Sequence, residues 1–293
     1  METVGQPTKK KRKANSQFKI AFRQFRRNRI AVVGLCILVV IILACIFADY
    51  LTPHNYDKQD ISNRFAPLSS THPAGTDQFG RDLFTRILRG GQISLLVAAG
   101  AVLLSSTIAV VLGTTAAFFG KAYEMIVMRV IDILQSIPSL LLAAAVSTAI
   151  GTGITNSIIA IAVGQIANTT RLVFAATLIV KNSEYMEAAR ACGASNGRII
   201  FKHVIANILA PLIVQVTSRL GNGITQIASL SFLGLGVVPP TPEWGSILNA
   251  GRQFIRSYWP IVTFPGVAIA LTLLCVSFVG DGIRDAVDPR LKR

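Results

Sequence analysis

Charged residues are scarce in this chain, and their scarcity excludes an ordinary water-soluble domain. Asp, Glu, Lys and Arg together make up 15% of the 293 residues, whereas 52% are hydrophobic. Soluble globular domains carry charged residues at about 25%. No polar block is long enough to fold by itself, so the surplus of apolar residues indicates a single membrane domain whose helices face lipid.

The sequence also lacks the motifs of nucleotide binding and metal-dependent hydrolysis. It contains neither a GxxxxGK[ST] phosphate loop nor HExxH. Its three histidines, His54, His72 and His203, are scattered, and no carboxylate pair lies within an apolar run. We therefore expect no catalytic residue, metal site or cofactor in this chain, which argues against a membrane enzyme. Energy for active transport would have to come from another subunit.

Cysteine is rare, and the spacing of the cysteines does not suggest disulfide pairs or a metal site. The four cysteines form no CxxC pair, and three of them lie inside apolar runs. This distribution predicts small core or lipid-facing residues and excludes a disulfide framework. The residues are Cys36, Cys45, Cys192 and Cys275.

Acidic residues are few, with 14 Asp and Glu against 29 Lys and Arg, which gives a net charge of +15. Ten of the basic residues lie in residues 1–29, including the run Lys9–Lys13. Such a run can be a nuclear address or a nucleic-acid tail. An uncharged stretch, Ile30–Ala48, follows at once and favours a positive flank that keeps a cytoplasmic tail inside the cell. We therefore expect no nucleic-acid partner.

Long uncharged stretches predict six transmembrane helices in residues 30–293. The 19 residues of Ile30–Ala48 suffice to cross a hydrocarbon core of about 30 Å. Residues 48–92 form an expected outer loop, and residues 181–211 a cytoplasmic loop. The other five expected spans are Gly90–Gly120, two spans within Ile133–Thr170 divided at Gly151-Thr152-Gly153, Pro211 to about Leu235, and Ile261–Val279.

This topology accounts for the positive charge. With both termini in the cytoplasm, the cytoplasmic pieces carry twenty basic residues and the outer pieces seven. The residues between the second and third spans give three further expectations. Lys121, Glu124 and Arg129 mark a short cytoplasmic turn, and Arg129 can pair with Asp132 three residues on. Pro138 bends the third span near its cytoplasmic end.

The cytoplasmic loop has its own pattern, EYMEAARACGASNGRIIFKHVIANILAP, from Glu184 to Pro211. Good helix formers are followed by Gly193, which can adopt the left-handed geometry that ends a helix. Ser195 or Asn196 can then cap a second helix. The loop therefore predicts a helix, a glycine turn and a second helix, with Pro211 closing the segment.

Four phrases of the sequence resemble binding-protein-dependent ABC importer permeases, and the last of them is the ending GDGIRD (residues 280–285) with DPRL (residues 288–291). Glu187-Ala188-Ala189 with Gly193 is similar to the EAA loop of that family. Residues 75–86, GTDQFGRDLFTR, resemble a GTDxxGRDxxSR phrase, with threonine in place of serine. The third phrase, residues 231–245, reads SFLGLGVVPPTPEWG. From its residues alone, the second phrase predicts an interfacial amphipathic helix around Arg81 and Asp82 that leads into the next span.

The resemblance implies an all-α, six-helix type I ABC importer permease fold. It also implies four kinds of contact: a homologous second permease, two ATPase subunits that hold ATP and Mg, an extracytoplasmic substrate-binding protein, and the cell membrane. In that family the short helix of the loop docks on the ATPase, a role that falls on Glu187, Ala188, Ala189 and Gly193. The substrate implied is a dipeptide or oligopeptide, with nickel or a metal chelate as the alternative. A self-sufficient channel or carrier is the rival hypothesis, although no clear inverted repeat supports it.

Polar residues in the fifth span recur at spacings of 4, 3, 4 and 3. At about 100° per residue they share one face of a helix. A charged residue with amide neighbours is costly against lipid, so this face should line a translocation pathway or form a polar seam between helices. Where Gln226 and Arg219 stand, the family often has an acidic and a small residue. The five residues are Gln215, Arg219, Asn222, Gln226 and Ser229.

Overall fold

The computed structural model describes residues 22–287, and within that range the regular elements are helices without a β-strand. The basic run Lys9–Lys13 and the phrase Asp288–Leu291 lie outside the described residues. After α2 (Arg29–Ile46) the α-helices are α3 (Ala48–Leu51), α4 (Leu83–Phe119), α5 (Lys121–Ser136), α6 (Ser139–Ile150), α7 (Ile154–Lys181), α8 (Glu184–Ala191), α9 (Asn196–Arg198), α10 (Ile205–Phe232), α11 (Trp244–Gly251) and α12 (Pro260–Val287). Short helical turns occupy η1 (Ile61–Asn63), the π-helical η2 (Ile199–Val204) and η3 (Arg252–Phe254).

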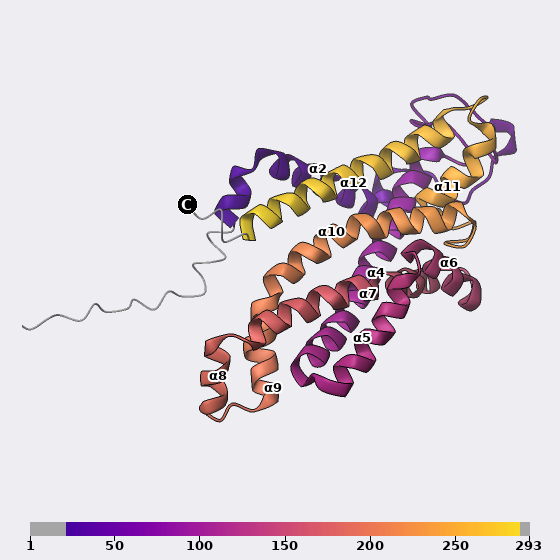
Figure 1. Cartoon of the computed structure of the whole chain (residues 1–293). Coiled ribbons are helices and arrows are strands. Elements are labelled where there is room, and N and C mark those ends of the chain that lie inside the picture. Colours follow the sequence, from indigo (N-terminus) through magenta and orange to yellow (C-terminus); the bar gives the residue numbers. More distant parts are fainter. Residues whose placement is uncertain (1–21, 288–293) are drawn as a thin grey trace, which may run out of the picture.

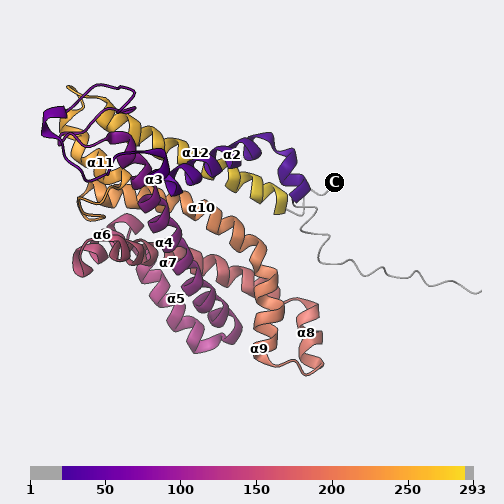
Figure 2. The ribbon, with the colours of Figure 1, turned by 180° about the vertical axis from the view of Figure 1, so that it is seen from behind.

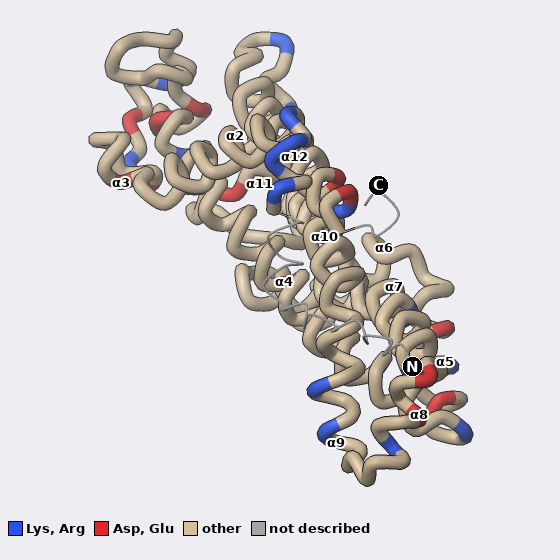
Figure 3. Tube along the Cα trace, turned by 90° about the vertical axis from the view of Figure 1, so that its left-hand side faces the viewer, with Lys and Arg blue, Asp and Glu red and all other residues tan. Residues whose placement is uncertain are grey.

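The long helices run between two ends of an elongated molecule (Figure 1). Helix α11 and the segment 52–82 lie at one end, and α8 and α9 lie at the other, as the view from behind confirms (Figure 2). Most charged residues gather toward the two ends of the molecule (Figure 3), and Arg219 in the middle of α10 is an exception. Five of the described helices are long and apolar enough to cross a membrane, or six spans when α5 and α6 count as one. The all-helical, six-span prediction is confirmed.

The centre of the molecule is the pair α4 and α7, which make the most extensive helix contact among the described elements. Small residues allow this close approach. Gly113 of α4 faces the backbone of Thr170 and the side chain of Val173 on α7. Val97, Ala101, Ala160 and other apolar side chains continue the same core toward α10.

Two expectations about α4 were wrong. The residues 83–88 do not form a separate interfacial helix, because α4 begins at Leu83 and continues to Phe119. Leu83 and Leu88 are buried, since the segment 52–82, α11 and α12 cover the first turns of α4. The expected outer loop is consequently shorter, with α3 at its start and residues 83–92 already helical.

The third span also differs from expectation. Lys121, Glu124 and Arg129 do not form a turn; they lie on α5, and the chain turns at Gly120, whose φ is +66°. Helices α5 and α6 meet at Pro138 with a bend of 94°, so the third span is broken rather than merely bent. The break at residues 151–153 is confirmed, because α7 begins at Ile154.

The expected ion pair of Arg129 with Asp132 is absent from the described contacts. Asp132 instead pairs with Arg171 on α7. The neighbouring helix offers a guanidinium across a helix–helix contact, and sequence spacing within α5 could not reveal it.

Pro211 does not close the loop segment. It lies inside α10, and the chain from Asn196 to Phe232 is one helical span of 37 residues. A proline removes one backbone donor, which a membrane helix tolerates when neighbouring groups satisfy the freed carbonyl. The last span is likewise longer than expected, with α12 running from Pro260 to Val287.

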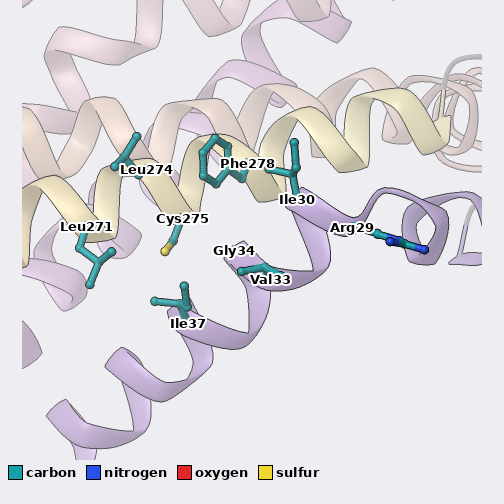
Figure 4. A pocket seen from close by; sticks show the side chains of 9 residues that line it. All are labelled: Arg29, Ile30, Val33, Gly34, Ile37, Leu271, Leu274, Cys275 and Phe278. Carbon is teal, nitrogen blue, oxygen red and sulfur yellow. The ribbon is translucent and has the colours of Figure 1, made fainter.

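Helices α2 and α12 pack along each other, with Gly34 against Phe278 and Cys275. Beside this contact lies a shallow groove whose lining is apolar, apart from Arg29 at one end (Figure 4). A surface of this kind suits acyl chains and offers nothing to a polar solute. The nine lining residues are Arg29, Ile30, Val33, Gly34, Ile37, Leu271, Leu274, Cys275 and Phe278.

Replacing Gly113 with alanine tests the α4–α7 contact. A Cβ at this position would stand 2.8 Å from the carbonyl oxygen of Thr170 and 2.9 Å from Cβ of Val173. We expect Gly113→Ala to cost about 1–3 kcal/mol through overpacking. Gly266→Ala is the matched control, because nothing lies within 4 Å of its Cβ on α12, and alanine raises helix propensity there. Thermal unfolding in detergent micelles measures both, and equal melting temperatures would contradict this packing.

Candidate functional site

The loop between α7 and α10 folds as the sequence predicts. Helix α8 ends at Ala191, Gly193 has φ +76°, and α9 follows at Asn196. The amide of Ala194 donates to the carbonyl of Ala189 (3.1 Å) and that of Gly193 to Arg190 (2.9 Å). This is a Schellman ending, in which a left-handed residue satisfies the last free carbonyls of a helix. Ser195 caps the next helix by accepting from the amide of Arg198 (3.4 Å). We call residues 184–198 the elbow.

One side of the elbow is anchored to the helical bundle. Met186 is 1% exposed and packs in a cluster with Phe118, Val173 and Ile199. The guanidinium of Arg190 lies 5.8 Å from the centre of the Phe118 ring. Just before the elbow, Lys181 Nζ donates to the carbonyl of Ala117 (2.8 Å) at the end of α4. These contacts fix α8 relative to α4 and α7.

The other side of the elbow faces outward. Glu187 and Ala188 are exposed, and Ala189 is half-buried. Gly193 is also exposed, and a Cβ added to it would meet no atom within 4 Å. The structure therefore places the four predicted contact residues on one short, accessible stretch. Their docking role remains a prediction.

The five polar residues of the expected pathway face lie along α10, but they do not share one environment. Gln215 and Arg219 pair with each other: with its amide oriented to satisfy both groups, the Gln215 oxygen accepts from Arg219 Nε (2.9 Å) and Nη2 (3.1 Å). Asn222 is exposed, and Ser229 is half-buried. Asn222 is thus accessible, whereas Gln215 and Arg219 are half-buried.

Gln226 lies in a polar seam. Its side-chain oxygen accepts from Gln165 of α7 (3.1 Å), and its nitrogen donates to Ser139 at the start of α6 (3.1 Å). This network joins α10 to α6 and α7 beside the sharp bend at Pro138. Such bonds stabilise helix contacts in apolar surroundings. The structure thus shows Gln226 in a seam between helices, and a role in a pathway stays a prediction for all five residues.

Residues 193–197, GASNG, match the spacing of a GxSxG nucleophile motif. That motif needs a strand-to-helix turn that exposes the serine beside a sheet. Here the segment joins two helices, and Ser195 is a helix cap. The context gives no support for a hydrolase.

The comparisons with known proteins agree with this architecture. The family described as "Binding-protein-dependent transport system inner membrane component" matches residues 109–293. The chain belongs to this family. A second family, the N-terminal TM domain of oligopeptide transport permease C, matches residues 16–67 of the permease.

Curated relatives cover nearly the whole permease. The dipeptide transport system permease protein DppC of Alkalihalophilus pseudofirmus is 43% identical over 95% of this chain and 92% of its own length. The DppC protein of Escherichia coli K12 is 42% identical over 92% of each chain. A solved inward-facing structure of the MetNI methionine ABC transporter matches with a TM-score of 0.56 and 21% identity, over 69% of the permease and 96% of that chain. The fold is that of a type I ABC importer permease.

At the opposite end of the permease, the GTDQFGRD phrase forms a buried ion network that sequence reasoning missed. Arg81 Nε donates to Asp77 Oδ2 (2.7 Å), and Arg86 Nε lies 3.5 Å from the same oxygen. The other oxygen, Asp77 Oδ1, accepts from the amides of Phe79 (2.8 Å) and Arg81 (3.0 Å). These charges are buried, which supports the structural reading of the phrase over substrate contact. The signal in the sequence was the Asp–Arg spacing of four.

Glu243 is another buried charge that sequence reasoning missed. It is 0% exposed, and its carboxylate accepts from the hydroxyl of Ser94 (2.7 Å) and the amide of Ser246 (3.0 Å). Burial raises the pKa of this carboxyl group, and the hydrogen bonds oppose the shift. Glu243 caps α11, and the adjacent Trp244 donates from Nε1 to the carbonyl of Ile87 (2.9 Å). The phrase PPTPEWG therefore fastens α11 to α4.

The expectation that the histidines are scattered was wrong for two of them. The rings of His54 and His72 stack with their centres 4.8 Å apart, whereas His203 lies in η2. The sequence contains no periodic signal for this contact, because it depends on the path of the segment 52–82.

Replacing Gly193 with alanine tests the elbow. A Cβ meets no neighbour at this position, but φ +76° is unfavourable for L-residues, so Gly193→Ala should destabilise the turn by about 1–2 kcal/mol. Gly197→Ala is the control, because it has open space and no positive φ. Amide hydrogen exchange across residues 184–198 should accelerate in the first variant only. Equal protection of the elbow in the two variants would contradict the turn.

Proposed function

We propose that this permease is the membrane subunit of an ATP-driven importer of dipeptides or oligopeptides and that its elbow docks on an ATPase subunit. The assembly would contain a second, homologous permease, two ATPase subunits that bind ATP and Mg, and an extracytoplasmic binding protein. The elbow is the observation that supports this proposal most strongly. It is a capped, exposed helix on a chain that has no phosphate-binding motif of its own. We infer that the elbow and both termini lie in the cytoplasm.

The elbow and the polar face of α10 are joined by one continuous helical span. From Asn196 the helix runs through η2 and α10 to Phe232, and it carries Gln215, Arg219 and Asn222 on the way. Movement of the elbow by an ATPase would therefore reach the polar face along one helical span, through η2 and Pro211, without an intervening loop. Two conformations that open to opposite sides of the membrane require such a coupled element.

A peptide substrate is supported by the names of the relatives, which are dipeptide transport permeases. The chemistry of the α10 face around Arg219 and Asn222 fits this class. Arg219 presents a guanidinium whose donors can bind a peptide carboxylate, and Asn222 offers amide groups for a peptide backbone.

The docking role can be tested by enlarging the contact surface. Glu187→Trp places a bulky side chain on the exposed face of α8, and we expect co-purification of the ATPase subunits to be lost while membrane insertion persists. Asp281→Trp is the control, because Asp281 is also exposed but lies on α12, away from the elbow (Figure 1). If the Glu187→Trp variant co-purifies with as much ATPase subunit as the wild type, docking at α8 is contradicted.

The pathway role is tested separately at Arg219. Arg219→Ala should reduce peptide uptake into proteoliposomes by roughly tenfold or more, since a charge-assisted hydrogen bond contributes about 1.5–3 kcal/mol. Assembly of the importer should be unchanged. Ser218→Ala, at the exposed neighbouring position, serves as the control. Wild-type transport kinetics in Arg219→Ala would remove this residue from the pathway.

A further inference from the structure

The segment 52–82 brings two histidines and an aspartate together at the α11 end of the chain. His54 follows α3, His72 precedes the turn at Gly75, and Asp82 is the N-cap residue of α4. One ligand atom from each of the three lies within 4.8 Å of the others. His54 and Asp82 lie near the two ends of the segment 52–82, so the cluster brings these ends together.

The distances place the three side chains within reach of one metal ion. His72 Nδ1 and Asp82 Oδ1 are 2.8 Å apart, a separation that subtends an angle of about 90° at an ion about 2.0–2.1 Å from each atom. In the tetrahedral geometry of zinc this angle opens to about 109° and the ligand atoms lie about 3.3 Å apart, so the 4.8 Å limit requires the atoms to close by up to about 1.5 Å. His54 and His72 are only half-buried, and a small side-chain rotation supplies that movement.

The surrounding hydrogen bonds already orient two of the three groups. The ring nitrogen Nε2 of His54 lies 2.9 Å from the carbonyl oxygen of Thr71, and because a carbonyl can only accept, Nε2 carries the proton. In the neutral ring Nδ1 then holds the lone pair that a metal requires. Asp82 Oδ2 accepts from the amide (2.7 Å) and hydroxyl (2.6 Å) of Thr85, which leaves Oδ1 directed at His72. Outer hydrogen bonds of this kind are typical of metal ligands.

The donor set selects the class of ion. Two imidazoles and one carboxylate suit Zn²⁺ and other first-row divalent metals, whereas Mg²⁺ prefers an all-oxygen octahedron with several waters. Three protein ligands leave a further coordination position open at the half-exposed side. The buried neighbour Arg81 does not oppose the ion with a free charge, because it is paired with Asp77 (2.7 Å).

We propose that His54, His72 and Asp82 form a binding site for a divalent first-row transition metal, of which Zn²⁺ is the probe. The ion replaces the proton shared by His72 and Asp82 and joins the start of the segment 52–82 to the first turn of α4. It acts as a clasp on this end of the permease. The site requires no partner chain, so its test is independent of the proposed transport function.

Zinc binding to the purified full chain tests the site. The protein is purified in detergent with a tag that contains no histidine, dialysed against Zn²⁺ in excess Mg²⁺, and its metal content is measured by mass spectrometry. Two variants remove ligands, His54→Ala and His72→Ala, and each should weaken binding by roughly tenfold or more, at least as much as loss of an outer-shell partner. His203→Ala removes the one histidine outside the cluster and should leave binding unchanged.

A second readout separates loss of the site from loss of the fold. Hydrogen exchange in residues 52–82 should slow when Zn²⁺ is added to the wild type and to His203→Ala, and should not respond in the double variant H54A/H72A. Without metal, the double variant should keep wild-type protection in α4 and α7, since neither histidine contributes to that core. Zinc content and protection in H54A/H72A equal to wild type would overturn the proposal, as would a wild-type chain that binds no Zn²⁺ at 100-fold molar excess.

Discussion

An apolar solvent leaves no alternative partner for a backbone amide, and this constraint determines most of the structure. Each chain segment at membrane depth must bond to itself, which only a helix achieves without a closed barrel. The long helices α4, α7, α10 and α12 satisfy it along most of their length, with Pro211 in α10 and Pro265 in α12 as exceptions. Contacts between them then depend on close packing, because lipid is as apolar as the helix surfaces. Small residues such as Gly113 provide that packing.

The same constraint shows how the chain accommodates proline and irregular turns in α10. Pro211 gives no amide to the carbonyl of Asn207, and the preceding η2 has the wider π-helical spacing. The side-chain amide of Asn207 in turn donates to the carbonyl of His203 (2.6 Å). The helix therefore stays continuous, but its backbone bonding is weakest between the elbow and the polar face. Kinks in long helices concentrate at such places.

Local chemistry made the helices and the elbow predictable, while long-range contacts were beyond the sequence. Uncharged runs located the spans, and Gly193 marked the elbow because only a left-handed residue completes its turn. Pro211 was misjudged because a proline inside a long membrane helix removes one backbone hydrogen bond without ending the helix. The pairing of Asp132 with Arg171 and the stacking of His54 on His72 join residues far apart in sequence. The periodicity of polar and apolar residues carries no information about such long-range contacts, because they depend on how separate segments are placed in space.

The two ends of the permease differ in a way that bears on movement. At the α11 end, Asp77, Arg81 and Glu243 are buried and hydrogen-bonded, and breaking such a group away from its partners is costly. A Cβ on Gly245 would stand 2.2 Å from the carbonyl of Ala228, so α11 lies directly against α10 there. At the elbow end, the charged residues Glu187 and Arg198 are exposed and can change partners at little cost. A helix held firmly at one end and accessible at the other responds to a pull by bending, and the weakest backbone bonding, at η2 and Pro211, lies between the two.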